Sequence, residues 1–152
     1  MNILFLGSGT STGIPSLCCD CDICKSDDHK NKRLRSSILV RNNGNHLLVD
    51  TSTDLRQQCL SNNITHINQV LYTHHHADHL HGIDELRSFN HFNKVIIPCY
   101  GNKNTIYEIK EKFNYQKISD KYEEKSYEKT IKKNLAKSIS QKLILRLSLI
   151  KW

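Results

Sequence analysis

The chain has 152 residues, 38% of them hydrophobic and 24% charged, which is the composition of an ordinary globular domain. No apolar run approaches the roughly 18 residues of a membrane-spanning helix and no secretory signal opens the sequence, so we exclude a membrane protein and expect a cytoplasmic one. Residues 1–100 carry nine basic and nine acidic side chains, so the whole net charge of +7 lies in residues 101–152, a basic tail on a neutral domain.

Strand and helix patterns alternate along the first three quarters of the chain. Apolar runs predict strands at residues 2–6, 36–40, 46–49, 70–73 and 94–98. Capping residues and a 3.6-residue period predict helices at residues 53–60, 78–89 and 103–113. The sequence NNGN at residues 42–45 predicts a hairpin turn, because Asn and Gly tolerate positive φ. The pattern therefore indicates an α/β fold whose sheet is not purely parallel.

The strongest chemical signal is the sequence HHHADH at residues 74–79, directly after the fourth predicted strand. In an extended segment, residues two apart point to the same side, so His74 and His76 can bind one cation together. Where the chain turns into a helix, Asp78 and His79 are directed to a second position nearby. Imidazole and carboxylate ligands suit zinc, manganese or iron, so we favour a metal site over a histidine-rich surface tract.

The motif His-x-His-x-Asp-His after an apolar strand resembles the signature of the metallo-β-lactamase superfamily. Three further segments narrow the resemblance, and their sequences are GSGTSTGIP (7–15), LVDTSTDLRQQ (48–58) and HLHGIDELR (79–87). Together they resemble the branch that contains the phosphoribosyl cyclic phosphate phosphodiesterase. The likeness covers roughly residues 1–115, and it implies a metallo-β-lactamase-like αββα sandwich of which this part forms the first αβ half.

The resemblance also implies a role for each residue of the site. His74 and His76 would bind the first of two divalent transition-metal ions, zinc or manganese, and Asp78 and His79 the second. Asp50 would support the site from behind the ligands. A metal-bound hydroxide would then attack a phosphodiester bond in a small cyclic or nucleotide-like substrate. The expected activity is that of a metal-dependent phosphodiesterase-type hydrolase, with Asp78 and Asp50 as its catalytic acidic residues.

A second group of metal-binding residue types is Cys19-x-Cys21-x-x-Cys24, which offers three thiolates within six residues. The resemblance implies a structural zinc here, whose fourth ligand in that branch is a histidine near the carboxyl end. This chain has no histidine after His91, and Cys18 could replace it only through a strained turn. Reduced free cysteines are therefore an equally weighted alternative.

Other cysteines and histidines are predicted to be structural. Two isolated cysteines would be small buried apolar residues, and six histidines would be surface imidazoles: Cys59 and Cys99, and His29, His46, His66, His75, His81 and His91. The glycines of residues 7–13 are spaced one residue too far apart for a dinucleotide-binding loop, so we expect a tight loop beside the metal site instead.

The sequence offers fewer ligands than a two-metal site needs. In the family, further histidines and a bridging aspartate lie downstream, whereas residues 101–152 contain no histidine and one aspartate, Asp120. We therefore expect residues 116–152 to be a divergent basic segment of a truncated or frame-shifted product. One sheet face would then lack its partner layer, which favours homo-oligomers. The alternative function is a non-catalytic fragment that binds a metal, or RNA through its basic tail.

Overall fold

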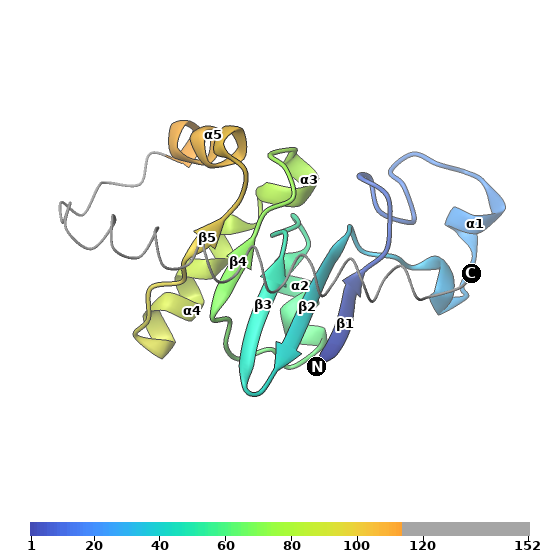
Figure 1. Cartoon of the computed structure of the whole chain (residues 1–152). Coiled ribbons are helices and arrows are strands. Elements are labelled where there is room, and N and C mark those ends of the chain that lie inside the picture. The colour runs from blue at the N-terminus through green and yellow to red at the C-terminus, as the bar shows by residue number, and fades with distance from the viewer. Residues whose placement is uncertain (114–152) are drawn as a thin grey trace, which may run out of the picture. The chain divides into compact units, whose positions relative to one another are not determined.

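The computed structural model describes residues 1–113, so the predicted basic segment 116–152 lies outside the described residues. Five strands form one sheet in the order β1-β2-β3-β4-β5 (Figure 1). The strands are β1 (Asn2–Gly7), β2 (Ser37–Asn42), β3 (Asn45–Val49), β4 (Gln69–Leu71) and β5 (Cys99–Tyr100). The first three pair antiparallel, whereas β3, β4 and β5 pair parallel, which confirms the mixed sheet.

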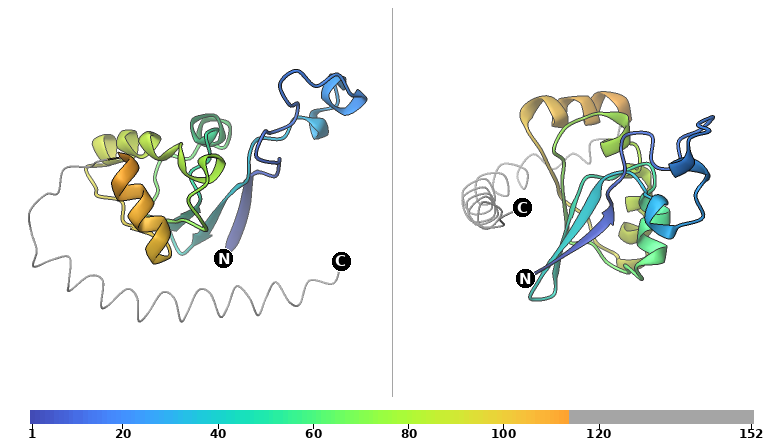
Figure 2. Two further views of the ribbon diagram at one scale, coloured as in Figure 1. Left: turned by 90° about the horizontal axis from the view of Figure 1, so that it is seen from above. Right: turned by 90° about the vertical axis from the view of Figure 1, so that its right-hand side faces the viewer.

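Helical segments connect the strands and are short except near the end of the described part. They are α1 (Asp22–Lys25), α2 (Leu55–Ser61), α3 (Ala77–Leu80), α4 (Leu86–Asn93) and α5 (Lys103–Phe113), with 3₁₀ turns at His29–Asn31 and Ile83–Glu85. Helices α2 and α4 lie over the same face of the sheet, and the segment that carries α1 projects beyond it (Figure 2). Among residues 1–113, no helix is both long and apolar enough to span a bilayer.

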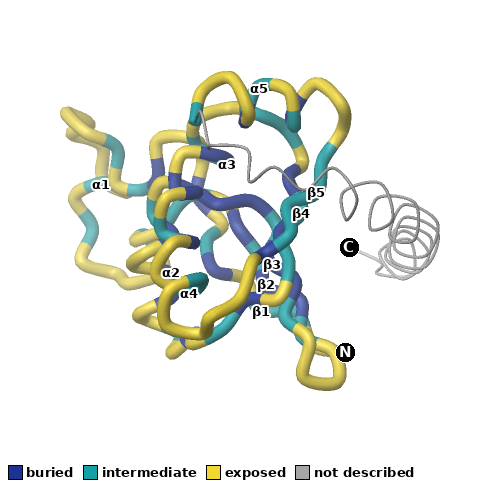
Figure 3. Tube along the Cα trace, turned by 90° about the vertical axis from the view of Figure 1, so that its left-hand side faces the viewer, coloured by how far each residue is buried: buried dark blue, intermediate teal, exposed yellow. Residues whose placement is uncertain are grey.

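The core lies between the sheet and these helices. Strand register places Leu39 opposite Leu48, and Leu48 opposite Val70, so the three side chains share one face, and none is exposed. Leu55 of α2 and Leu86 of α4 complete the cluster from the helical side. Figure 3 shows that much of the trace of the central strands is buried, whereas α2 and α4 are largely exposed. Each such side chain contributes roughly 1.5–3 kcal/mol through burial, which fixes the sheet against its helices.

The β2–β3 hairpin and helix α5 confirm two sequence predictions. Asn43 and Gly44 both have positive φ, at 47° and 78°, as the NNGN sequence requires. Helix α5 has the predicted bounds, and the predicted helix at 53–60 begins two residues later, at Leu55.

Two predicted elements are wrong. The helix expected at 78–89 is broken: α3 ends at Leu80 and α4 begins at Leu86, with Gly82 packed directly against the Ser52 carbonyl between them. The amide of Gly82 donates to Thr51 instead of continuing the helix. The strand expected at 94–98 is absent, because Lys94 ends α4 with a left-handed φ of 53° and the chain reaches the sheet only at Cys99.

Candidate metal centre

The histidine motif lies where two neighbouring parallel strands end. Asp50 directly follows β3, and the motif at residues 74–79 follows β4 and runs into α3 (Figure 1). Backbone hydrogen bonds join the two connections, because the amide of Asp50 donates to the Leu71 carbonyl and the amide of Thr51 donates to the His79 carbonyl. Residues 29 positions apart in the sequence are thereby held together at one edge of the sheet.

Asp50 is the centre of this arrangement. Its side chain is 6% exposed, and its φ of 62° is one that Asp tolerates better than most residues. The carboxylate accepts hydrogen bonds from the amide and the hydroxyl of Thr73 and from Nδ1 of His79, each at 2.8 Å. These three hydrogen bonds hold the carboxylate in place and fix the orientation of the His79 ring.

Three of the predicted ligands bring their rings together. The ring centroid of His74 lies 4.6 Å from that of His76 and 4.1 Å from that of His79. Burial lowers the pKa of His74, and the neighbouring His79 and His76 rings lower it further. Neutral imidazole is the form that binds a metal, so the environment favours ligation.

His79 and Asp78 pass a geometric test for sharing one ion. Because Nδ1 of His79 donates to Asp50, Nε2 carries the free electron pair, and it faces Oδ2 of Asp78 at 3.4 Å. Two ligands on a tetrahedral ion, at bond lengths of about 2.0–2.2 Å, lie roughly 3.4 Å apart. The His79–Asp78 pair therefore has a separation that suits one divalent ion. Within residues 1–113, however, a group of three or more ligand atoms within 4.8 Å of one another forms at the cysteines and not at the histidine motif, so the role of the motif as a ligand set stays a prediction.

A cavity of about 400 Å³ lies against Asp50 on the side of β1 and β2. Its lining is formed by the glycine-loop start, the start of β2 and the end of β3, namely Phe5, Gly7, Ser8, Ser36, Ser37, Ile38, Val49 and Asp50. Gly7 and Ser8 open the loop at residues 7–13, which confirms that this loop begins beside Asp50. The space is a depression open to solvent, and Phe5 in its lining is 72% exposed.

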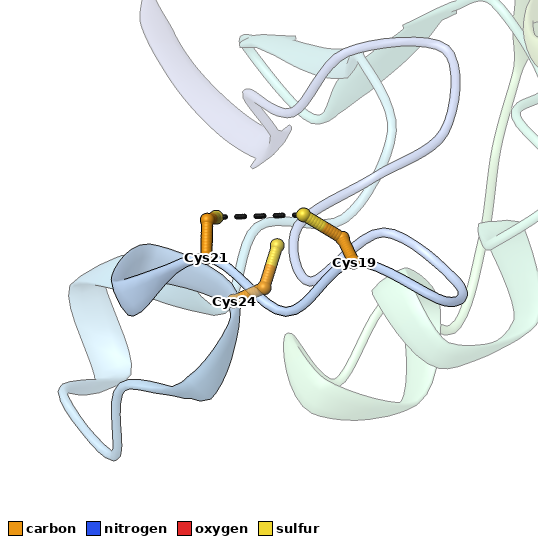
Figure 4. A group of neighbouring side chains, drawn as sticks. All are labelled: Cys19, Cys21 and Cys24. Carbon is orange, nitrogen blue, oxygen red and sulfur yellow. Dashed lines mark hydrogen bonds between the residues drawn. The ribbon is translucent and has the colours of Figure 1, made fainter.

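The three cysteines gather in the segment around α1 (Figure 4). Their three sulfur atoms lie within 4.8 Å of one another, and those of Cys19 and Cys21 are 3.4 Å apart. Thiolates on one zinc ion, at bond lengths of about 2.3 Å, lie roughly 3.8 Å apart, so the trio fits zinc after a small adjustment. Cys18 is not part of the trio, and its φ is 60°.

Hydrogen bonding makes the Cys21 thiol more acidic than an ordinary cysteine. Bonds from the Cys24 amide and from the Cys19 thiol lower the pKa of Cys21 to about 7. The pKa of Cys24 is raised, because the lowering by the Ser16 amide is outweighed by the neighbouring sulfurs and by burial. By contrast, burial raises the pKa of Cys59 and Cys99 to about 11. Cys59 is buried as predicted, whereas Cys99 is only partly buried.

Some residues behave differently from the sequence prediction. His46 is not a free surface imidazole: it is half-buried, its ring stacks on His66 at 3.8 Å, and its Nδ1 contacts the His66 carbonyl. Sequence reasoning also missed Thr73, although its place directly before the histidines was a usable signal. It missed Arg35 and Asp54 as well, and no local pattern could have paired residues 19 positions apart.

Known proteins match this chain over most of the described part and beyond. Residues 45–144 match the family described as "Beta-lactamase superfamily domain". An octanoyltransferase of Porphyromonas gingivalis is 39% identical over 116 residues, which are 76% of this chain and 23% of that protein. Coenzyme PQQ synthesis protein B of Methylorubrum extorquens is 33% identical over 112 residues, covering 64% of this chain and 38% of that protein. The chain thus spans less than half the length of these curated relatives.

Solved structures agree with the sequence matches. A diphosphatase from the PhnP family has a TM-score of 0.71 and 40% identity, covering 74% of this chain and 46% of that one. Zn²⁺-bound PqqB from Methylobacterium extorquens has a TM-score of 0.54 and 26% identity, covering 66% of this chain and 49% of that one. The five-stranded mixed sheet and its helices are those of the predicted fold class. The chain therefore belongs to the metallo-β-lactamase superfamily, in the branch that includes the PhnP-family diphosphatase.

Proposed function

We propose that this chain is part of a metal-dependent hydrolase that cleaves a phosphodiester bond in a small cyclic or nucleotide-like substrate. The observation that carries the proposal is the approach of Nε2 of His79 to Oδ2 of Asp78, 3.4 Å apart, with His79 oriented by buried Asp50. Proteins orient a metal-binding histidine in this way, through a carboxylate on its other nitrogen.

Each side chain has a defined task in this proposal. Asp50 accepts a hydrogen bond from Nδ1 of His79 and so keeps Nε2 available as a ligand. His74 and His76 would hold one divalent ion, and Asp78 and His79 the other. When bound, such ions lower the pKa of water to about 7 and stabilise negative charge on a phosphoryl group. The cavity beside Asp50 would receive the substrate.

The names of the relatives point to different reactions, and only part of each relative is shared. The octanoyltransferase match covers 23% of that protein, so its named activity need not reside in the shared region. The diphosphatase match covers 46% of that chain, twice this share, and a diphosphatase cleaves a phosphorus–oxygen bond. This comparison supports a phosphoryl group in the substrate.

The test uses the full chain with bis(p-nitrophenyl) phosphate and added Zn²⁺ or Mn²⁺. We expect metal-stimulated release of nitrophenol that falls to the background of free metal in His76→Ala and in Asp78→Ala. His91→Ala is the matched control, because this histidine is exposed on α4 and should leave turnover unchanged. Metal bound per chain is measured on the same samples. Turnover that survives both ligand changes would rule out the proposed site.

A further inference from the structure

An ion pair outside the histidine motif joins two segments of the site. Nη1 of Arg35 donates to Oδ1 of Asp54 at 2.8 Å, and the backbone amide of Arg35 donates to Oδ2, also at 2.8 Å. Nε of Arg35 donates to the carbonyl of Ser11, at 2.8 Å, in the loop at residues 7–13. One guanidinium therefore connects this loop to the connection between β3 and α2.

The side chain of Asp54 binds Arg35 and does not cap helix α2. It occupies the N-cap position of α2, where Asp ordinarily accepts from the first helical amides, but its side chain makes no capping hydrogen bond. Both carboxylate oxygens are used by Arg35 instead. The side chains of Arg35 and Asp54 are 29% and 18% exposed, so the pair is screened far less than a surface pair.

Two fully buried polar side chains reinforce this pair. Nε2 of Gln58 donates to the Arg35 carbonyl at 2.7 Å, and the hydroxyl of Ser52 donates to Oε1 of Gln58 at 3.0 Å. The Ser52 hydroxyl also accepts from the Asp54 amide, at 3.2 Å. Ser52 and Gln58 have no exposed surface. Buried polar groups destabilise a fold unless they form hydrogen bonds. This connected set of hydrogen bonds therefore specifies one position of the connection between β3 and α2.

The connection between β3 and α2, which Asp54 ties to Arg35, also carries Asp50. Residues 50–54 begin at the carboxylate that orients His79 and end at the carboxylate that binds Arg35. Between them, Thr51 is fixed to α3 by its amide and its hydroxyl, which donate to the carbonyls of His79 and Leu80 at 2.9 Å. Asp50 and Asp54 are therefore the two ends of one short connection, which contacts the histidine motif at one end and Arg35 at the other.

We propose that Arg35 and Asp54 are a positioning pair, which holds residues 50–54 so that Asp50 keeps the His79 ring in its ligand orientation. The consequence for metal binding rests on the function proposed above, whereas the consequence for the His79 ring does not. Arginine is required because it donates to Asp54 and Ser11 from different nitrogens of one rigid plane. The three donors of lysine radiate from one nitrogen, so they do not reproduce the two-point geometry of the guanidinium plane.

The decisive readout is the Nδ1 proton of His79 in the metal-free full chain. Its hydrogen bond to Asp50 gives a downfield imidazole N–H resonance that exchanges slowly with water, and His79→Gln identifies it. We expect exchange at least about tenfold faster in Arg35→Met and in Asp54→Asn, and an intermediate rate in Arg35→Lys. Arg87→Met is the matched control, because its pair with Asp84 is 70% and 57% exposed, and exchange should be unchanged.

Core amides separate positioning from general stability. A pair that only stabilises the fold would accelerate exchange of the Leu39 and Leu48 amides as much as that of His79 Nδ1. Faster exchange confined to His79 and to the Thr73 amide supports positioning. Unchanged His79 exchange in a folded Arg35→Met protein overturns the proposal, as does the lack of a slow His79 N–H in the wild type. If Arg35→Met does not fold, Arg35→Lys and Asp54→Asn decide by the same criterion.

Metal affinity provides the link to function. Residues that orient a ligand typically change metal affinity by about 10–100-fold, so Arg35→Met should weaken Mn²⁺ or Zn²⁺ binding at the histidine motif by about tenfold. If the wild type binds no ion that His76→Ala removes, the proposed hydrolase function fails. The exchange of the His79 proton still decides the positioning role in that case.

Discussion

Replacing Asp50 by Asn or by Ala separates its structural contribution from its effect on His79. Asn has nearly the same shape as Asp and tolerates the φ of 62° at this position, whereas Ala does not. In the Asp50→Asn protein, the amide oxygen can still accept from the Thr73 backbone. The amide nitrogen then lies where Oδ2 received Nδ1 of His79.

The two changes should differ in their cost to stability. Asp50→Asn exchanges a hydrogen bond to a charged acceptor for one between neutral groups, a loss of about 1–2 kcal/mol in the free energy of unfolding. Asp50→Ala removes all three hydrogen bonds of the carboxylate and adds about 1 kcal/mol of left-handed backbone cost. The expected total loss in the free energy of unfolding is about 4 kcal/mol. It is no larger because Thr73 is exposed, so that its hydroxyl can bond water after the carboxylate is removed.

The effect on metal binding should not follow this order. The amide of Asp50→Asn donates to Nδ1 of His79, which moves the ring proton to Nε2, the nitrogen that faces Asp78. Metal binding should therefore be lost almost as completely in Asp50→Asn as in Asp50→Ala, despite the smaller loss of stability.

Urea unfolding followed by circular dichroism gives the stabilities, and calorimetric titration with Zn²⁺ gives the affinities. Asp84→Asn, at an exposed carboxylate, should change stability by less than about 0.5 kcal/mol and leave metal binding intact. Wild-type affinity in a folded Asp50→Asn protein would refute the reasoning, because Asp50 would then not select the tautomer of His79.

Three further predictions concern other parts of the described chain. Gly82→Ala should lower the free energy of unfolding by about 3 kcal/mol in urea, because the new Cβ would lie 2.0 Å from the Ser52 carbonyl oxygen. Burial lowers the pKa of His46 below its ordinary 6.5, so the unfolded chain binds its proton more tightly. Stability from this residue is complete above pH 6.5 and declines as the pH falls, so His46→Gln should flatten the acid side of the stability curve. Zinc bound in the cysteine segment should be lost in Cys21→Ser and retained in Cys18→Ser, by elemental analysis; equal loss in both would contradict the ligand set.

Local patterns predicted those parts of the fold that local physics determines. The hairpin at Asn43 and Gly44 depends on two φ values that these residue types favour, and α5 depends on an uninterrupted apolar period. The histidine motif was recognised because ligand spacing is itself local. The carboxylate of Asp50 was assigned only through the family resemblance, since no sequence period relates residue 50 to residue 79.

The errors arose where contacts between distant residues outweighed the local pattern. The apolar helical period of the sequence continues through Gly82. In the structure, Gly82 packs against Ser52 and its amide donates to the Thr51 carbonyl, so the helix does not continue through it. Asp54 was a capping candidate by type, yet Arg35, 19 residues earlier, binds its carboxylate. The apolar run that ends at Pro98 was expected to be a strand, but the sheet begins one residue later.

The orientation of His79 follows from the sheet before any ion is involved. Parallel pairing of β3 and β4 brings Asp50 next to Leu71, whose carbonyl accepts the Asp50 amide. The amide of Thr51 then donates to the His79 carbonyl, and the Asp50 carboxylate accepts from the His79 ring. The backbone and the side chain of His79 are therefore both fixed by two consecutive residues. A ligand held by these contacts does not lose further rotamer freedom on binding, which favours metal affinity. Changes to this connection should therefore affect metal binding more than equally destabilising changes in the core.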